Sequence, residues 1–251
     1  MPDFNDTFIK TVNAERAFEM CKTVLGAREY SRIGQIIGDP GTGKSRTTKW
    51  LAEELNGVRI EAWAGINAKE LFVLLVEELN TQGHAIDPQG TSNSLFYKLK
   101  QVVNGKLIIV DEANHLSWQV LERLRALSDQ SGAAVILSGT DILERRFKDA
   151  RVRIYLKQLA QRIGAKRVYF NRFMDDGEFA HFVITPRFGQ VAQTTAARFR
   201  QRSRGNWRMA LELGDAIERV MEMEGSNKLT IGMVETAASF LAGQDFGGAE
   251  Q

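Results

Sequence analysis

The sequence predicts an α/β protein with a parallel sheet between helices, followed by a small helical subdomain. Between residues 31 and 170, short apolar segments alternate with longer segments whose apolar residues recur at helical spacing. From about Asp175 onward, helical spacing alone remains. Strands that alternate with helices are typical of a parallel sheet covered on both faces, and the run of helices after them indicates a separate subdomain.

Local patterns predict each element of the sheet region. A helix is predicted over 13–26, where Ala17, Cys21 and Val24 recur at helical spacing, and a buried strand over 106–111, where apolar residues run together. The same two patterns predict strands over 31–37, 57–63, 133–138 and 166–170, and helices over 46–55, 67–80, 92–103 and 118–130.

Beyond the sheet region, helices are predicted over 176–183, 191–202, 206–224 and 230–242. Their apolar stripes are interpreted as packing surfaces. We therefore expect four parts along the chain: a helical lead-in over 1–30, an α/β core over 31–174, a helical lid over 175–244 and a flexible tail over 245–251.

The composition is that of an ordinary globular protein, with 43% hydrophobic and 25% charged residues, which excludes disordered and fibrous classes. No stretch approaches the ~20 apolar residues of a membrane span, and the N-terminus lacks the order of a signal peptide. We therefore expect a cytoplasmic protein with no membrane partner. The single cysteine, Cys21, lies in a helical pattern and is interpreted as a buried core residue.

The net charge is only +2, but the basic residues gather in two segments. The first contains Arg145, Arg146, Lys148, Arg151, Arg153 and Lys157, and the second contains Arg198, Arg200, Arg202, Arg204 and Arg208. Each cluster is compatible with a solvated helix face and with a surface that contacts phosphates.

A glycine-rich loop follows the first predicted strand and matches the pattern G-x-x-x-x-G-K-[ST]. Its residues are Gly38, Asp39, Pro40, Gly41, Thr42, Gly43, Lys44 and Ser45, with Arg46 next to them. The glycines let backbone N–H groups point at phosphate oxygens, and the following helix adds positive potential at its N-terminus. The loop therefore predicts ATP binding, with Lys44 at the β and γ phosphates and Ser45 at Mg²⁺.

An acidic pair ends the buried strand 106–111. Asp111 is expected to hold Mg²⁺ through water, and Glu112 to polarise the water that attacks the γ-phosphate. Thr140, just past the next strand, is a candidate to sense the γ-phosphate. Ser138 is the alternative, and a plain turn residue is a third interpretation. Together the loop and the acidic pair predict a Mg²⁺-dependent ATP hydrolase.

The order of phosphate loop, Asp-Glu strand, polar sensor strand, arginine-bearing segment and helical lid resembles the AAA+ ATPases over essentially the whole chain. The segments Asp111–Leu116, Leu124–Asp129 and Ile136–Thr140 resemble the DNA-transposition ATPases, namely the phage Mu B protein and the TnsC, TniB and IstB group. Secretion ATPases of the ExeA type share much of this pattern. The resemblance implies an AAA+ P-loop core with a C-terminal helical lid, in a bacterial or phage-infected cell.

The resemblance also implies roles for arginines outside the loop. Gln158–Ile163 resembles the segment that carries an arginine finger, so Arg162 is expected to complete the ATP site of a neighbouring subunit, with Arg145 and Arg146 as rivals. A guanidinium suits this role because it is always charged and its fork contacts a transferring phosphoryl group. Gly205–Ala210 resembles the start of the sensor-2 helix, in which Arg208 would contact the γ-phosphate of its own chain.

The resemblance further implies ATP-dependent rings or filaments of the chain on duplex DNA, which select a target and activate a transposase. Only about 30 residues precede the first strand, so the DNA-binding appendage of the Mu B pattern is not expected, and DNA would be contacted through its phosphates. Candidate contacts are Arg46, Lys49, Lys98, Lys100 and Lys106. Two other interpretations remain: a nucleotide-gated scaffold of a secretion complex, and a helicase or clamp loader of a phage replisome.

Overall fold

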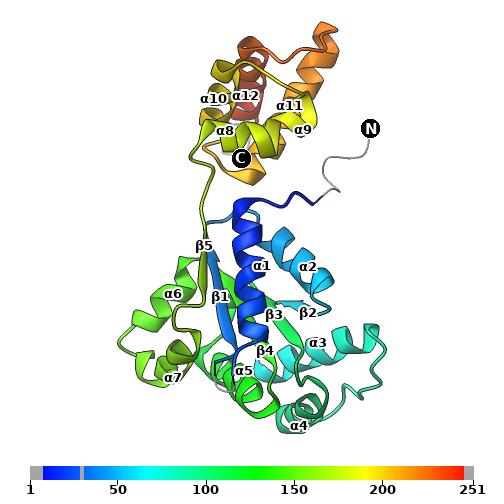
Figure 1. The fold of residues 1–251 in the computed structure, drawn as a ribbon, viewed down its shortest axis with the longest axis vertical. Coiled ribbons are helices and arrows are strands. Elements are labelled where there is room, and N and C mark those ends of the chain that lie inside the picture. The colour runs from blue at the N-terminus through cyan, green and yellow to red at the C-terminus, as the bar shows by residue number, and fades with distance from the viewer. Residues whose placement is uncertain (1–7, 29–30, 246–251) are drawn as a thin grey trace, which may run out of the picture. The chain divides into compact units, whose positions relative to one another are not determined.

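The computed structural model describes residues 8–28 and 31–245 (Figure 1). The chain divides into two compact units. Among the residues described, the first comprises 12–40 and 44–170, and the second comprises 171–245 together with Gly41–Gly43 and residues 8–11. The first unit has an apolar core on each face of a sheet, and the second has a core of its own between helices.

A five-stranded sheet with strand order β2-β3-β4-β1-β5 organises the first unit. Its strands are β1 (Ile33–Gly38), β2 (Val58–Glu61), β3 (Leu107–Asp111), β4 (Ala134–Gly139) and β5 (Arg167–Phe170). All neighbouring strands are parallel, with Ile37 opposite Gly139 and Glu61 opposite Asp111. The carboxyl ends of β1, β3 and β4 therefore meet at one edge, where ligands bind in open α/β sheets.

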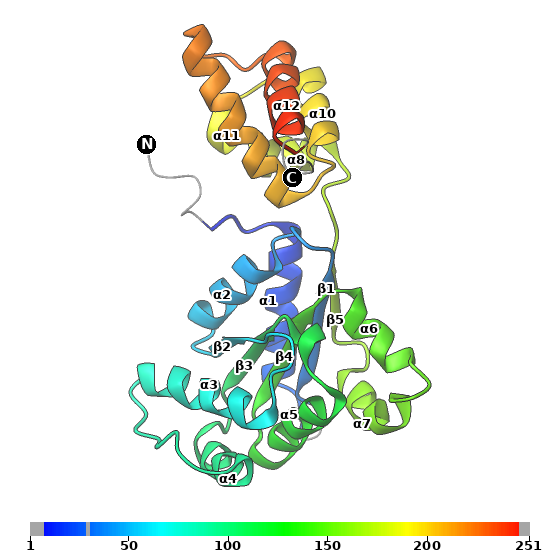
Figure 2. The same ribbon diagram turned by 180° about the vertical axis from the view of Figure 1, so that it is seen from behind.

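Helices cover both faces of this sheet, as the opposite views in Figures 1 and 2 show. One face packs against α1 (Val12–Leu25) and α2 (Lys44–Glu54) through residues such as Ile36 and Ile109. The other face packs through residues such as Ile37 and Val110. Its helices are α3 (Ala68–Thr81), α4 (Ser92–Val102), α5 (Trp118–Ser131), α6 (Asp141–Lys148) and α7 (Arg153–Ile163). The predicted α/β class is therefore confirmed.

Polar caps explain where several of these helices begin. Asn67 and Glu70 form a reciprocal capping box at the start of α3, and the side chains of Thr91 and Ser117 accept N–H groups at the starts of α4 and α5. Helices α6 and α7 were not predicted. Leu143 is the buried residue of α6, so the charged residues around it hide the apolar spacing.

The second unit is helical. It contains α8 (Asp176–Phe179), the π-helical turn η2 (Ala180–Ile184), α9 (Thr185–Phe188), α10 (Gln193–Arg202), α11 (Trp207–Glu224) and α12 (Ile231–Asp245). The predicted helix over 176–183 is in fact a longer segment that contains the π turn. Pro186 explains the irregularity, because proline removes a backbone N–H donor inside a helix.

Two parts of the expected organisation fall partly on residues outside those described. These are the N-terminal part of the lead-in, 1–7 with 29–30, and the tail residues 246–251. Within the lead-in, Val12–Leu25 forms α1, which packs with the first unit. Within residues 8–28 and 31–245, no helix has the length and apolar character needed to cross a membrane.

Candidate functional site

The phosphate-binding loop joins β1 to α2, since β1 ends at Gly38 and α2 begins at Lys44. Gly41 and Gly43 have positive φ angles of 77° and 92°. A β-carbon at Gly43 would meet no atom within 4 Å, so its backbone conformation, rather than crowding, makes glycine the favoured residue there. The N-terminus of α2 therefore follows a tight glycine turn, which is the arrangement that binds phosphates in P-loops.

Lys44, the first residue of α2, has a buried side chain. Its Nζ donates hydrogen bonds to the carbonyl oxygens of Gly38, at 2.7 Å, and Asp39, at 2.9 Å. These bonds hold the ammonium group against the loop it serves. Ser45 is exposed and Arg46 is half-buried, so both side chains lie at the surface of this helix end.

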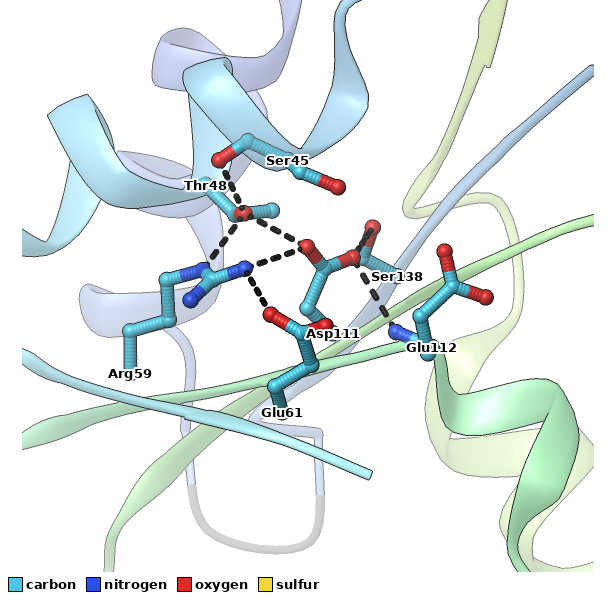
Figure 3. A network of polar contacts seen from close by, with 7 residues as sticks. All are labelled: Ser45, Thr48, Arg59, Glu61, Asp111, Glu112 and Ser138. Atoms are coloured by element: carbon cyan, nitrogen blue, oxygen red, sulfur yellow. Dashed lines mark hydrogen bonds and ion pairs between the residues drawn. The ribbon is translucent and has the colours of Figure 1, made fainter. Parts of the chain in front are cut away.

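Asp111 ends β3 and is fully buried, and both of its carboxylate oxygens are hydrogen-bonded (Figure 3). Oδ1 accepts the hydroxyl of Ser138 at 2.8 Å and the backbone N–H of Glu112 at 3.1 Å. Oδ2 accepts a guanidinium N–H of Arg59 at 2.7 Å and lies 3.2 Å from the hydroxyl of Thr48. Residues from α2, β2, β3 and β4 therefore fix this carboxylate in one orientation.

The environment keeps Asp111 ionised. Burial alone would raise its pKa, but hydrogen bonds from Arg59, Ser138 and Ser45 and the positive charge of Arg59 hold the pKa below its ordinary value. Mg²⁺ prefers oxygen ligands, and it is usually held by one or two carboxylates together with phosphates and waters. An ionised, oriented carboxylate beside the Ser45 hydroxyl fits this preference.

Arg59 is a site residue that the sequence analysis missed. Besides its ion pair with Asp111, its Nε donates to the Thr48 hydroxyl at 3.0 Å, and its Nη2 lies 3.0 Å from Glu61. The strand pattern Val58-Arg59-Ile60-Glu61 places an arginine between buried apolar residues. A charged residue at such a position indicates a nearby acidic partner, and this was the signal for Arg59 in the sequence. Its partner could not be inferred, because the register of β2 against β3 is set by the sheet.

Glu112 adopts a left-handed backbone conformation, with φ 52° and ψ 34°. This conformation is uncommon for residues other than glycine and is often stored at functional sites. The short helix η1 (Ala113–His115) follows, and the Glu112 carbonyl accepts the N–H of His115 at 2.9 Å. In Figure 3 the Glu112 carboxylate lies on the side of Asp111 opposite to Arg59.

The two sensor candidates have different surroundings. The Ser138 hydroxyl donates to Asp111, whereas the Thr140 hydroxyl oxygen is buried without a hydrogen-bond partner among the residues described. Asn114 connects this region to the turn after Glu112, because its Oδ1 accepts the backbone N–H of Thr140 at 3.1 Å. Asn114 was also missed by the sequence analysis, although it lies only three positions after Asp111.

Arg162 and Arg145, two of the three arginine-finger candidates, have ion-pair partners within the chain. Arg162, on α7, donates to both carboxylate oxygens of Asp129, at 3.3 and 3.1 Å, and Asp129 also binds Arg125. Arg145, on α6, is exposed and forms an ion pair with Asp141, one helical turn earlier. Arg146, next to it, is half-buried. If Arg162 contacts the ATP site of a neighbouring subunit, its hydrogen bonds with Asp129 must weaken or break.

In the second unit, Arg208 is exposed near the start of α11, which Asn206 caps by accepting the N–H of Met209 at 3.2 Å. The basic residues before it are largely paired within this unit. Arg198 and Arg202 both bind Glu235, and Arg200 binds Asp176. Much of the second basic cluster therefore forms an intrachain ion-pair network, which favours the structural interpretation of those arginines.

The lysines proposed to contact DNA also differ in their surroundings. Lys49, on α2, is exposed. Lys98 forms an ion pair with Asp87 at 2.9 Å, and Lys100 and Lys106 approach the side-chain oxygens of glutamines on α5 and after α3, at 3.3 and 3.4 Å. Lys98 is thus engaged inside the chain, whereas the contacts of Lys100 and Lys106 are long and easily exchanged for other acceptors.

The sequence and the fold are similar to those of known proteins. Residues 27–147 match the model of the family described as AAA domain. A potential ATP-binding protein of Staphylococcus aureus is 25% identical over 282 residues, which cover 94% of this chain and 97% of the relative. The Mu-like prophage FluMu DNA transposition protein B of Haemophilus influenzae is 29% identical over 143 residues, which cover 56% and 48%.

The ATP-dependent target DNA activator B of Escherichia phage D108 is 28% identical over 142 residues, which cover 56% of this chain and 45% of that protein. The aligned part thus spans about half the length of the two transposition proteins. Among solved structures, Cdc6p of Pyrobaculum aerophilum has a TM-score of 0.66 at 16% identity, and the match covers 94% of this chain and 69% of that one. The ORC2 protein of Aeropyrum pernix has a TM-score of 0.63 at 14% identity, covering 95% and 70%.

The parallel sheet, the glycine loop before α2 and the acidic pair at the end of β3 form the arrangement of a P-loop nucleotide-binding protein. Residues 27–147 match the AAA domain family, and the structural neighbours share the fold. Over about half of its length, the chain is similar to two proteins that are named for DNA transposition and for target DNA activation.

Proposed function

We propose that this protein hydrolyses ATP in a Mg²⁺-dependent reaction at the loop Gly38–Ser45. Lys44 would neutralise charge on the β and γ phosphates, while the loop N–H groups and the start of α2 bind phosphate oxygens. Ser45 and Asp111 would hold Mg²⁺, which when bound neutralises charge that develops on the phosphates. The observation that carries this proposal is the buried, ionised Asp111 beside the helix that begins with Lys44.

Glu112 would accept hydrogen bonding from the attacking water and orient it toward the γ-phosphate. Its left-handed backbone, held by the bond from the His115 N–H, supports a fixed carboxylate position. The buried and unpartnered hydroxyl of Thr140 supports its role as the γ-phosphate sensor, because an orphaned buried hydroxyl is costly unless a ligand satisfies it. Ser138, which donates to Asp111, would instead orient that carboxylate.

We further propose that ATP binding drives assembly of the chain on duplex DNA, and that the assembly selects a transposition target and activates a transposase. The relatives named for DNA transposition and for target DNA activation support this role. The exposed basic residues of α7, among them Arg153 and Lys157, would supply positive charge for contacts with DNA phosphates. Arg162 would complete the site of a neighbouring copy and Arg208 its own.

Electron microscopy of the protein with duplex DNA tests this proposal, comparing ATP or a slowly hydrolysed analogue with ADP. Rings or filaments on DNA that require the triphosphate are expected. In a separate binding assay, the affinity for DNA should fall steeply between about 50 and 200 mM salt, as it does for proteins that bind mainly phosphates. ATPase activity with no DNA-bound assembly would contradict the DNA role and favour a secretion-type scaffold. Unwinding of DNA or loading of a clamp would favour a replication factor.

A further inference from the structure

We propose that Arg59 is a positioning residue that tunes how strongly Mg²⁺ couples to nucleotide binding, because it shares the Asp111 carboxylate with the metal. This inference rests on the proposed function of the site. It assigns a role to a residue on β2, outside the phosphate loop and outside the acidic pair.

Arg59 connects three elements around Asp111 (Figure 3). Its guanidinium donates to Asp111 on β3 at 2.7 Å, to Thr48 on α2 at 3.0 Å and to Glu61 on its own strand at 3.0 Å. Thr48 lies one turn beyond Ser45, and its hydroxyl approaches the Ser45 carbonyl at 3.0 Å. The fork of Arg59 therefore ties the metal-binding carboxylate to the helix that carries the metal-binding serine.

The charges at this position are balanced before any metal binds. Asp111 is fully buried, and its Arg59 partner is 21% exposed along the side chain. A positive charge 2.7 Å from a buried carboxylate offsets most of the negative potential that would attract a cation. Glu61 also pairs with Arg59, but its side chain is 63% exposed and therefore screened by water. It reduces the effect of the Arg59 charge on Asp111 only slightly.

Mg²⁺ and the Arg59 guanidinium are both cations, and both would be attracted to the Asp111 carboxylate, so each weakens the attraction of the other. Arg59 stabilises the metal-free protein, in which an unpaired buried Asp111 would be costly. It also lowers the attraction of the nucleotide-bound site for Mg²⁺, whereas without nucleotide phosphates the site offers too few oxygen ligands to hold the metal, whether or not Arg59 is charged. Removal of the charge of Arg59 should strengthen the coupling between metal and nucleotide, and removal of Glu61 should weaken it.

Binding of a fluorescent ADP tests this inference without catalysis. The dissociation constant for ADP is measured in EDTA and in excess Mg²⁺. The constant in EDTA divided by the constant in Mg²⁺ reports how strongly the metal favours nucleotide binding. In Arg59→Gln the ratio should rise on the order of tenfold, with a lower melting temperature in EDTA. In Glu61→Gln the ratio should fall about twofold, because the exposed Glu61 is partly screened. Arg59→Lys keeps the charge and should leave the ratio near that of the wild type.

A purely structural role for Arg59 gives a different result. Loss of the tie between β2 and α2 would then lower or leave unchanged the ratio in Arg59→Gln, and either outcome overturns the inference. If Arg59→Gln does not fold, Glu61→Gln decides the matter, because an unchanged or increased ratio in that variant also overturns it. A wild-type protein that binds no ADP at any Mg²⁺ concentration would instead overturn the proposed function.

Discussion

At the scale of single residues, the site depends on how neighbours set the charge and orientation of two adjacent acids. Asp111 is buried and ionised because hydrogen bonds and the charge of Arg59 outweigh the cost of burial. Glu112, next in sequence, has a left-handed backbone conformation, and its carboxylate lies on the side of Asp111 opposite to Arg59. One strand end thus presents two carboxylates in different environments, which suits one to hold a cation and the other to orient water.

Replacement of Glu112 by glutamine tests the second of these roles. Glu112→Gln should bind ATP as the wild type does, while its hydrolysis rate falls by about 100-fold or more, because the neutral amide cannot accept the proton of water. The ATP-bound assembly should therefore persist, and its lifetime can be followed by light scattering after dilution. Glu77→Gln, at an exposed position on α3, is the matched control. Normal turnover in Glu112→Gln would assign the base to another residue.

Cys21 is a second residue whose behaviour follows from burial. It lies in α1 against the sheet, and burial raises the pKa of its thiol from 9.0 to about 12. The neutral thiol should resist alkylation at pH 8 in the folded protein and react after unfolding in urea. Since the folded pKa is the higher one, the contribution of Cys21 to stability is present below pH 9 and is lost as pH rises toward 12.

Urea unfolding of the wild type and Cys21→Ala at pH 8 and pH 10 measures this effect. The stability difference between the two proteins should shrink or reverse at the higher pH, because only the wild type has a thiol that ionises on unfolding. A difference that stays constant would show that the thiol ionises equally in both states.

At the scale of elements, the turn after β3 and the end of β4 are joined by one side chain. Asn114 Oδ1 accepts the Thr140 N–H, and a β-carbon at Gly139 would lie 2.8 Å from that oxygen. The glycine thus leaves room for Asn114, and Asn114 holds the sensor turn beside the turn of Glu112. The motif pattern showed both turns, but not the hydrogen bond between them.

Replacement of Asn114 should therefore affect catalysis more than nucleotide binding. Asn114→Ala leaves the Thr140 N–H without its acceptor, which should cost about 1–3 kcal/mol of unfolding free energy, and kcat should fall while ATP affinity changes little. Asn114→Asp keeps an acceptor oxygen and should retain more activity. Urea unfolding and steady-state ATPase assays measure the two effects, and equal kcat in wild type and Asn114→Ala would argue against this connection.

At the scale of the whole molecule, the proposed assembly makes each ATP site depend on two copies. Arg162→Ala should bind ATP but lose turnover by about 1000-fold or more, as expected for an arginine finger. Lys44→Ala should fail to bind ATP at its own site. A mixture of the two variants places an intact Arg162 beside an intact loop, so ATPase activity should reappear on mixing.

The control for that experiment mixes Arg162→Ala with a Lys44→Ala/Arg162→Ala double variant, which offers no intact finger. Activity that stays absent in both mixtures, or an active Arg162→Ala alone, would assign Arg162 to the Asp129 ion pair and not to a neighbouring site. Arg145→Ala and Arg146→Ala, tested in the same way, would then identify the alternative finger.

Much of this protein could be predicted from patterns that are local in the chain. The loop from Gly38 to Ser45, the apolar run before Asp111 and the alternation of strands with helices each depend on residues close in sequence, so the α/β class and the nucleotide-binding loop could be predicted from them. Helix α6 was missed because charged residues dominate its segment, and the π turn before Pro186 has no simple periodic signal. Helix α7 was missed although Leu156, Leu159 and Ile163 recur at helical spacing.

The partners of the site residues needed the folded structure. Arg59 and Asp111 are 52 positions apart and meet only because β2 pairs with β3 in one register. Asn114 reaches Thr140, and Arg162 reaches Asp129, through packing of elements that no sequence spacing relates. Short-range patterns specify elements and motifs because backbone geometry repeats over a few residues, whereas charge pairing across a sheet depends on register and burial, which arise only when the whole chain packs.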